Sequence, residues 1–155
     1  MKVLRGLLCV GLLLVGSCSR TFEITPKMID GQLTFIDERT PDRCVSSVMV
    51  MKMASDAAPD ESHDRWRART TAWVDYGGYG CDDRLPLVYG QALRGNAEGS
   101  PESEVAPALL EVGEVYVVAV GSGATAMGSA NFRMLADGRV EELPRAGLTG
   151  EDTAP

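Results

Sequence analysis

The chain has 155 residues, with 22 acidic and 15 basic side chains and a formal net charge of −7. This length suits one domain with room for a hydrophobic core. The acidic balance argues against a nucleic-acid partner, because proteins that bind phosphate backbones present a basic surface to them. The same charge repels anionic lipid, so attachment to a membrane would need a source other than surface electrostatics.

Residues 1–18 have the layout of a secretory signal. Lys2 and Arg5 supply positive charge, residues 6–15 are apolar, and small residues precede Cys18. The apolar stretch has about ten residues, whereas roughly 20 are needed to cross a bilayer. Two alternatives remain open: an uncleaved membrane helix, and a signal for soluble export in which Cys18 is incidental.

The sequence Val15-Gly16-Ser17-Cys18 resembles the lipobox of bacterial lipoproteins. The resemblance implies that residues 1–17 form a helical signal peptide that is removed, and that Cys18 receives palmitate and other acyl chains. Two or more acyl chains anchor a protein stably to a membrane. Ser19, rather than aspartate, follows the cysteine, which by the same resemblance favours the outer membrane, facing the periplasm.

After Cys18 the sequence predicts a short tether, one domain and a tail. The tether covers residues 18–26 and ends in an edge strand near Phe22 and Ile24, and residues 27–145 form the domain. Short β-type segments bounded by turn residues are predicted at 32–37, 45–53, 65–75, 85–91, 115–120, 131–135 and 139–143. The segment 45–53 is apolar on both faces, which predicts a central strand. The segments 131–135 and 139–143 flank Ala136-Asp137-Gly138 and are predicted to form a hairpin, since Asp-Gly is the preferred pair for a tight turn. Residues 146–155 have little apolar content and are predicted to be disordered.

Cys44 and Cys81 are the cysteines left for the domain, because Cys9 lies in the leader and Cys18 is assigned to the lipid. An even pair in an exported protein predicts a disulfide, since the compartment is oxidising. A metal site is the alternative, but two isolated cysteines without neighbouring histidines rarely form one.

About seven or eight short strands with turns between them predict an antiparallel sandwich or barrel. Within the segment 110–120, Leu110, Gly113 and Tyr116 are spaced as in fibronectin type III and related immunoglobulin-like sandwiches, which this segment resembles. The resemblance implies an all-β, antiparallel immunoglobulin-like β-sandwich with a tyrosine corner, in which the Tyr116 hydroxyl bonds to upstream backbone. Position 118 is Val, so the inter-sheet disulfide of antibody domains is absent.

No segment carries a complete enzyme signature. Residues 121–126 contain two glycines after an apolar strand, as in a dinucleotide fingerprint, but no room remains for the helix that would hold a pyrophosphate. His63 stands in a polar loop without convergent partners, and no Gly-x-Ser-x-Gly motif is present. We therefore expect no enzyme activity, no cofactor and no metal.

The best candidate for binding is the glycine-rich loop that contains Tyr76 and Tyr79 and ends at Cys81. Tyrosines beside glycines are typical of binding loops, although the rings can equally cover the edge of a core. We expect a lipid-anchored envelope protein whose non-catalytic domain contacts another protein or a glycan. The alternative is a small-ligand-binding or hydrolase-inhibitor module that uses this loop.

Overall fold

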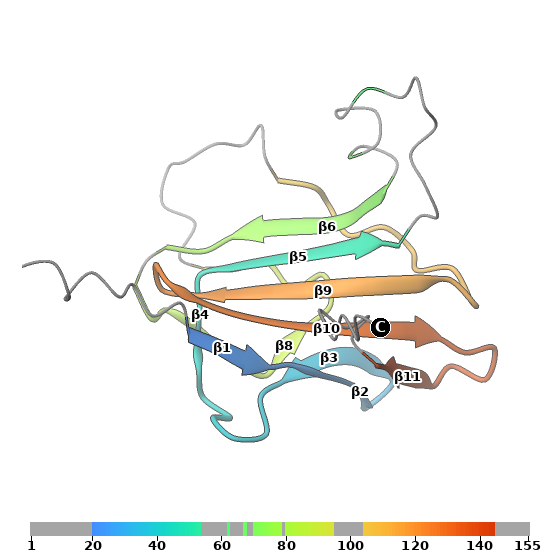
Figure 1. The fold of residues 1–155 in the computed structure, drawn as a ribbon, viewed down its shortest axis with the longest axis horizontal. Helices are drawn as coiled ribbons and strands as arrows, with labels where there is room; N and C mark the ends of the chain where they lie inside the picture. Colours follow the sequence, from blue (N-terminus) through green and yellow to red (C-terminus); the bar gives the residue numbers. More distant parts are fainter. Residues whose placement is uncertain are drawn as a thin grey trace, which may run out of the picture.

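A computed structural model describes residues 20–53, 62, 67, 70–78, 80–94 and 104–144. This part of the chain is almost entirely β, in several mainly antiparallel sheets (Figure 1). The strands are β1 (Arg20–Glu23), β2 (Thr25–Ile29), β3 (Gln32–Ile36), β4 (Cys44–Val45), β5 (Ser47–Lys52), β6 (Thr71–Tyr76), β7 (Asp83–Arg84), β8 (Leu87–Val88), β9 (Val115–Ser122), β10 (Ala126–Met134) and β11 (Val140–Leu143). Residues 1–19 and 145–155, which include the predicted signal peptide, Cys18 and the tail, lie outside the described residues.

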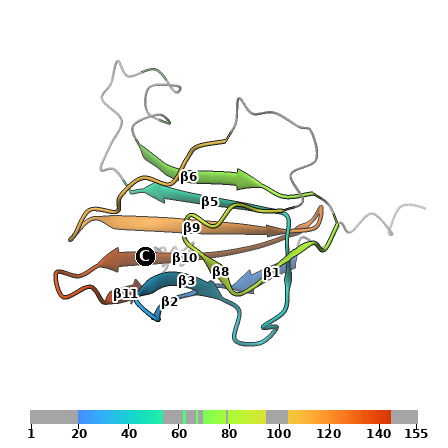
Figure 2. The same ribbon diagram turned by 180° about the vertical axis from the view of Figure 1, so that it is seen from behind.

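The largest sheet has the order β1-β10-β9-β5-β6, with β11 also paired to β10. Its pairs are antiparallel except for β1, which runs parallel to β10. Strands β1 and β11 share one edge of β10: β1 lies beside residues 126–129 and β11 beside residues 131–134. Both ribbon views show β1 and β11 one after the other along the same edge of β10 (Figures 1 and 2). The long strand β10 thus receives segments from both ends of the domain.

Strand alternation separates the two faces of the large sheet. On β5, Val48 and Val50 are buried in the core, whereas Met49 and Met51 lie on the opposite face. On β9, Tyr116, Val118 and Val120 are likewise in the core cluster. The central position predicted for the segment 45–53 is confirmed, because β5 lies between β9 and β6.

A second sheet has the order β2-β3-β8, and its inner residues share a core with the large sheet. Phe35 of β3 meets Phe132 of β10 with ring centroids 5.9 Å apart, and both rings are fully buried. Phe132 also stacks on Tyr116 at 5.6 Å. These aromatic contacts join the two sheets through one continuous hydrophobic cluster.

Strand β1 lies within the domain, so most of the segment predicted as a tether, 18–26, is folded. Phe22 and Ile24 are buried, and Phe22 packs over Gly128 of β10. A Cβ atom at position 128 would overlap the Phe22 ring and lie 2.9 Å from Ile24 Cγ1. The absence of a side chain at Gly128 therefore allows the start of the domain to approach β10 closely.

The strand predicted over residues 65–75 begins later, at Thr71, and ends at Tyr76. Arg67 and Thr70 have helical backbone, and residues 65, 66, 68 and 69 lie outside the described residues. The strand predicted over 85–91 is only β8, Leu87–Val88. In contrast, the hairpin predicted from residues 131–143 is confirmed: β10 and β11 pair from Asn131 to Leu143, and Gly138 at the turn has a φ of +79°.

A disulfide joins Cys44 to Cys81, with their Cα atoms 5.0 Å apart, which confirms the predicted bridge. Cys44 belongs to β4, a two-residue strand paired with β7. The backbone N–H of Leu85 also donates to the carbonyl of Arg43 at 2.9 Å. The bridge therefore links β4 to the chain just before β7, and these two strands pair over only two residues each.

Candidate functional site: a braced edge strap

The segment 104–114, here called the edge strap, runs along the free edge of β6 before it enters β9. Val105 and Val74 exchange both backbone hydrogen bonds at 3.0 Å. Farther along, the N–H of Ala108 donates to the carbonyl of Ala72 at 2.9 Å. These bonds satisfy edge groups of β6 that would otherwise stay open to another strand.

Tyr89 holds the middle of the strap. Its hydroxyl lies 2.7 Å from the carbonyl oxygen of Ala108 and 3.3 Å from that of Ala72, so its one proton bridges strap and strand. The ring meets Trp73 edge to face at 5.4 Å. Burial, together with the nearby Tyr116, raises the pKa of Tyr89 to about 12. The hydroxyl therefore remains a protonated donor at neutral pH.

Tyr116 holds the end of the strap. The backbone N–H of Glu111 donates to the Tyr116 hydroxyl oxygen at 2.9 Å, which is the upstream bond expected of a tyrosine corner. Leu110 packs against the core cluster. Gly113 has a φ of +86°, and its N–H donates to the carbonyl of Met134 at 2.9 Å. The three residues predicted to form the corner thus act together at one turn.

Leu109 lies between these two anchors with 97% of its surface exposed. Val112 and Val105 on the same strap are also exposed. An isolated exposed leucine is ordinary on a protein surface. Leu109 differs because the backbone on both sides is held by hydrogen bonds to tyrosine hydroxyls, so a partner would lose little conformational entropy on contacting it.

The loop that was predicted to bind through Tyr76 and Tyr79 is only partly described. Tyr76 is half-buried at the end of β6, and Tyr79 lies outside the described residues. The N–H of Gly77 donates to the carbonyl of Ser46 at 2.9 Å, and the disulfide at Cys81 closes the other end. The loop is therefore tied to the fold at both ends.

Two buried carboxylates brace the neighbouring chain segment. Asp75 accepts a hydrogen bond from the N–H of Leu93 at 3.0 Å, and Asp83 accepts one from the N–H of Arg94 at 2.7 Å. Both aspartates are more than nine-tenths buried. Each carboxylate satisfies a backbone donor, which is how buried polar groups are normally accommodated.

Of the remaining candidates from the sequence, the structure describes the glycine segment but not His63 or Cys18. The glycine pair at 121–126 forms the end of β9 and its tight connection to β10, with Gly123 at a φ of +61°. His63 and Cys18 lie outside the described residues. Over the described ranges, no group of three or more His, Cys, Asp or Glu side chains could hold a metal ion, and no helix is long and apolar enough to span a bilayer.

Sequence reasoning missed Leu109 and Tyr89 as functional candidates. Leu109 and Leu110 are adjacent and chemically identical, yet one is exposed and the other packs on the core. The Leu-x-x-Gly-x-x-Tyr spacing fixes Leu110 as the inward residue, so the outward direction of its neighbour follows from that motif. Comparison of the chain with protein-family models, curated proteins and solved structures found no match.

Proposed function

We propose that this chain is a lipid-anchored protein of the cell envelope whose β domain is a non-catalytic interaction module. The proposed domain architecture is an immunoglobulin-like sandwich. Two sheets that share a core and the bond between Tyr116 and Glu111 support this architecture. The observation that carries the interaction function is the exposure of Leu109 on the braced edge strap.

The proposed anchor rests on the lipobox resemblance and agrees with two features of the fold. Strand β1 begins at Arg20, so an acylated Cys18 would be separated from the sheet by a distance of at most about 7 Å of extended chain. The disulfide between Cys44 and Cys81 agrees with an oxidising compartment such as the periplasm. The domain would then be held directly against the membrane rather than on a long stalk.

Replacing Cys18 with serine tests the anchor. In wild-type cells we expect a detergent-phase protein whose mass corresponds to loss of residues 1–17 plus acyl chains. Cys18→Ser should leave the full-length precursor without lipid, since serine lacks the thiol that is acylated. Intact-mass spectrometry and detergent partitioning measure this, with Cys9→Ser as the matched control. Unchanged mass and partitioning of Cys18→Ser would rule the anchor out.

Replacing Leu109 with aspartate tests the interaction surface. The side chain makes no core contact, so the free energy of unfolding should change by less than about 0.5 kcal/mol. A charge at the centre of an apolar contact should weaken binding by about 2 kcal/mol or more, a loss of roughly thirtyfold. The measurement is crosslinking in intact cells followed by purification of the full chain and its bound protein or glycan.

Met127→Asp is the control for the Leu109 experiment, because Met127 is 59% exposed but lies on β10, away from the strap. We expect Leu109→Asp to lose the crosslinked species and Met127→Asp to keep it. If both variants retain the wild-type crosslinks, the edge strap is not the contact surface.

A second candidate is a small-ligand or hydrolase-inhibitor module centred on Tyr76 and the loop to Cys81. The bracing of this loop at both ends, by Gly77 and by the disulfide, favours it. Under this candidate, Tyr76→Ala would abolish binding while Leu109→Asp would not. The two variants therefore distinguish the two surfaces.

A further inference from the structure

Three methionines occupy alternate positions on one strand: Met49 and Met51 on β5, and Met53 directly after it. Strand alternation places such residues on one face. The ladder continues past the end of β5, because the N–H of Met53 donates to the carbonyl of Val115 at 2.7 Å. The three thioethers therefore form a row, here called the methionine row, along the sheet.

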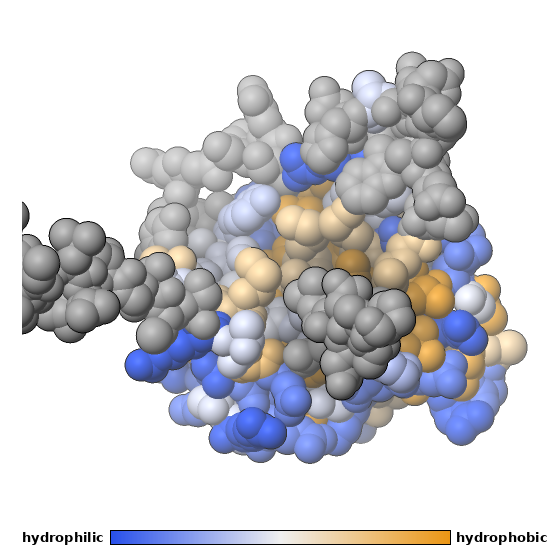
Figure 3. Space-filling view, viewed as in Figure 1, coloured by the Kyte–Doolittle hydropathy of each residue, from blue (hydrophilic) through white to orange (hydrophobic). Residues whose placement is uncertain are grey.

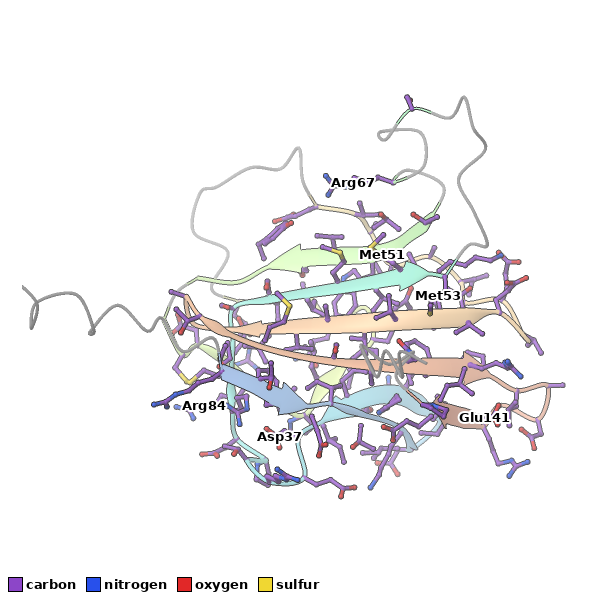
Figure 4. The ribbon with its side chains drawn as sticks, viewed as in Figure 1. Asp37, Met51, Met53, Arg67, Arg84 and Glu141 are labelled. Atoms are coloured by element: carbon purple, nitrogen blue, oxygen red, sulfur yellow. A yellow bond between two sulfur atoms is a disulfide. The ribbon has the colours of Figure 1, made fainter. Side chains whose placement is uncertain are left out.

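The methionine row faces away from the hydrophobic core. Val48 and Val50, the residues between, belong to the core cluster, whereas none of the three methionines packs against it. Met53 is 45% exposed, and Met49 and Met51 are partly exposed. Figure 3 shows hydrophobic residues gathered over β5 and β9, and Figure 4 shows where Met51 and Met53 lie along β5 and at its end. Packing in the core cluster therefore does not account for three methionines at these positions.

The neighbours of the row supply apolar walls. In the register of β5 and β9, Met49 is opposite Ala119 and Met51 is opposite Val117. On the other side, Thr71 of β6 is opposite Met51. Lys52 projects to the opposite face, where its ammonium pairs with Glu111 at 3.2 Å and Glu114 at 3.4 Å. The one cation within the row's own strand is therefore directed away from it and neutralised.

We propose that the methionine row binds a soft monovalent metal ion, Cu(I) or Ag(I). Thioether sulfur is a neutral, polarisable ligand that selects such ions over hard cations. Residues two apart on a strand have Cα atoms about 6.6 Å apart, and the three rotatable bonds of methionine let two sulfurs converge on one ion. Met51 is a member of both adjacent pairs, Met49 with Met51 and Met51 with Met53. It is therefore the central ligand.

This assignment predicts binding that does not depend on pH. Sites built from histidine, thiolate or carboxylate lose affinity in acid because protons compete with the metal, whereas a thioether carries no proton at these pH values. Of the described ionisable side chains, Tyr76 and Arg67 lie on or beside the outer face of these strands, and neither is a carboxylate, a thiol or an imidazole. Lys52, Glu111 and Glu114 are on the opposite face.

The test uses the full chain in detergent with free thiols blocked by iodoacetamide, titrated anaerobically with Cu(I) in the presence of ascorbate and a chromogenic competitor. Ag(I) is the redox-inert probe in a parallel titration. Wild type should bind the ion with the same affinity from about pH 5.5 to 8. Leucine replaces methionine with nearly the same volume, so the variants should fold.

Met51→Leu should weaken binding most, because it removes both pairs, and Met49→Leu or Met53→Leu should each weaken it less. The triple variant should lose stoichiometric binding, whereas Met127→Leu, an exposed methionine outside the row, should behave as wild type. Retention of affinity by the triple variant, or affinity that falls as pH is lowered, would overturn the site. If the triple variant fails to fold, the test rests on the three single variants: the site is overturned unless Met51→Leu has the lowest affinity for the ion. The assay is independent of lipidation and of Leu109, so its failure leaves the proposed interaction function intact.

Discussion

Replacing both Cys44 and Cys81 with serine is expected to lower the free energy of unfolding by about 4 kcal/mol. The bridge closes a loop between residues 37 positions apart, and the chain-entropy model gives this value for a loop of that size. Domains of this size have a total free energy of unfolding of about 5–15 kcal/mol. The double variant should therefore unfold at a much lower urea concentration than wild type, and part of it should be unfolded at physiological temperature.

Wild-type protein reduced with dithiothreitol is the matched control for this variant. Reduction should reproduce the loss in wild type and leave the double variant unchanged, which separates the bridge from any effect of the serines. Hydrogen exchange supplies a local readout at the N–H of Leu85, bonded to Arg43 beside the short pair β4 and β7. Equal urea midpoints for wild type and the double variant would show that the bridge does not stabilise the domain.

The features that the sequence predicted well are mostly those set by nearby residues. Asp137 and Gly138 form a tight turn whose conformation depends on those two residues, and the hairpin around them formed as expected. The apolar, β-branched run over residues 115–120 was predicted as a strand and forms most of β9. The disulfide was an exception: it was expected because the two cysteines follow a segment that resembles an export signal, and the bridge is present.

The features that the sequence did not predict depend on distant partners. Trp73 and Val74 are adjacent on β6 and both are buried, although only Trp73 belongs to the core cluster. A simple inward–outward alternation therefore does not describe this strand, and the segment predicted over 65–75 begins too early, since β6 starts at Thr71. The edge strand predicted near Phe22 and Ile24 is present as β1, but its pairing with β10 was not predicted, because it depends on Gly128, more than a hundred residues later.

The candidate site shows the same division. The spacing of Leu110, Gly113 and Tyr116 predicted a corner in which the Tyr116 hydroxyl bonds to upstream backbone, and the N–H of Glu111 makes such a bond. The exposure of Leu109 is set jointly by that corner and by Tyr89, whose hydroxyl reaches Ala108 from a separate part of the chain. A contact of that kind is created by the fold and has no counterpart in sequence spacing.

Asp37→Ala is expected to lower the free energy of unfolding by about 3 kcal/mol, the lower end of the range for removing one member of a buried ion pair. Asp37 accepts hydrogen bonds from the N–H groups of Arg39 at 2.8 Å and Thr40 at 3.0 Å, and from Arg43 Nε at 2.7 Å. Its side chain is only 2% exposed, and Arg43 lies 4.2 Å above the Phe22 ring. Removal would leave three donors unpaired and an arginine held over an aromatic ring without its counterion.

The effect should depend on pH in a definite direction. Burial alone would raise the pKa of the Asp37 carboxyl, but the hydrogen bond from Arg43 and those from the backbone of Thr40 and Arg39 outweigh it and hold the pKa below its ordinary value. The carboxylate therefore stabilises the fold fully above about pH 4 and loses this contribution as the pH falls through its lowered pKa. The difference between wild type and Asp37→Asn should be largest near neutral pH and shrink as the pH falls below about 4 and through the lowered pKa of Asp37.

Asp137 provides the matched control, because it makes the same kind of local bonds in solvent. It accepts from the N–H of Arg139 at 3.0 Å and from Arg139 Nε at 2.6 Å, two residues on, as Asp37 does with Arg39. Its side chain is 52% exposed, so water replaces the lost partners and screens the charge. Urea unfolding at several pH values should show a much smaller loss for Asp137→Ala than for Asp37→Ala. Equal losses would mean that burial does not strengthen the Asp37 cluster, and that its role is only to shape the turn before β4.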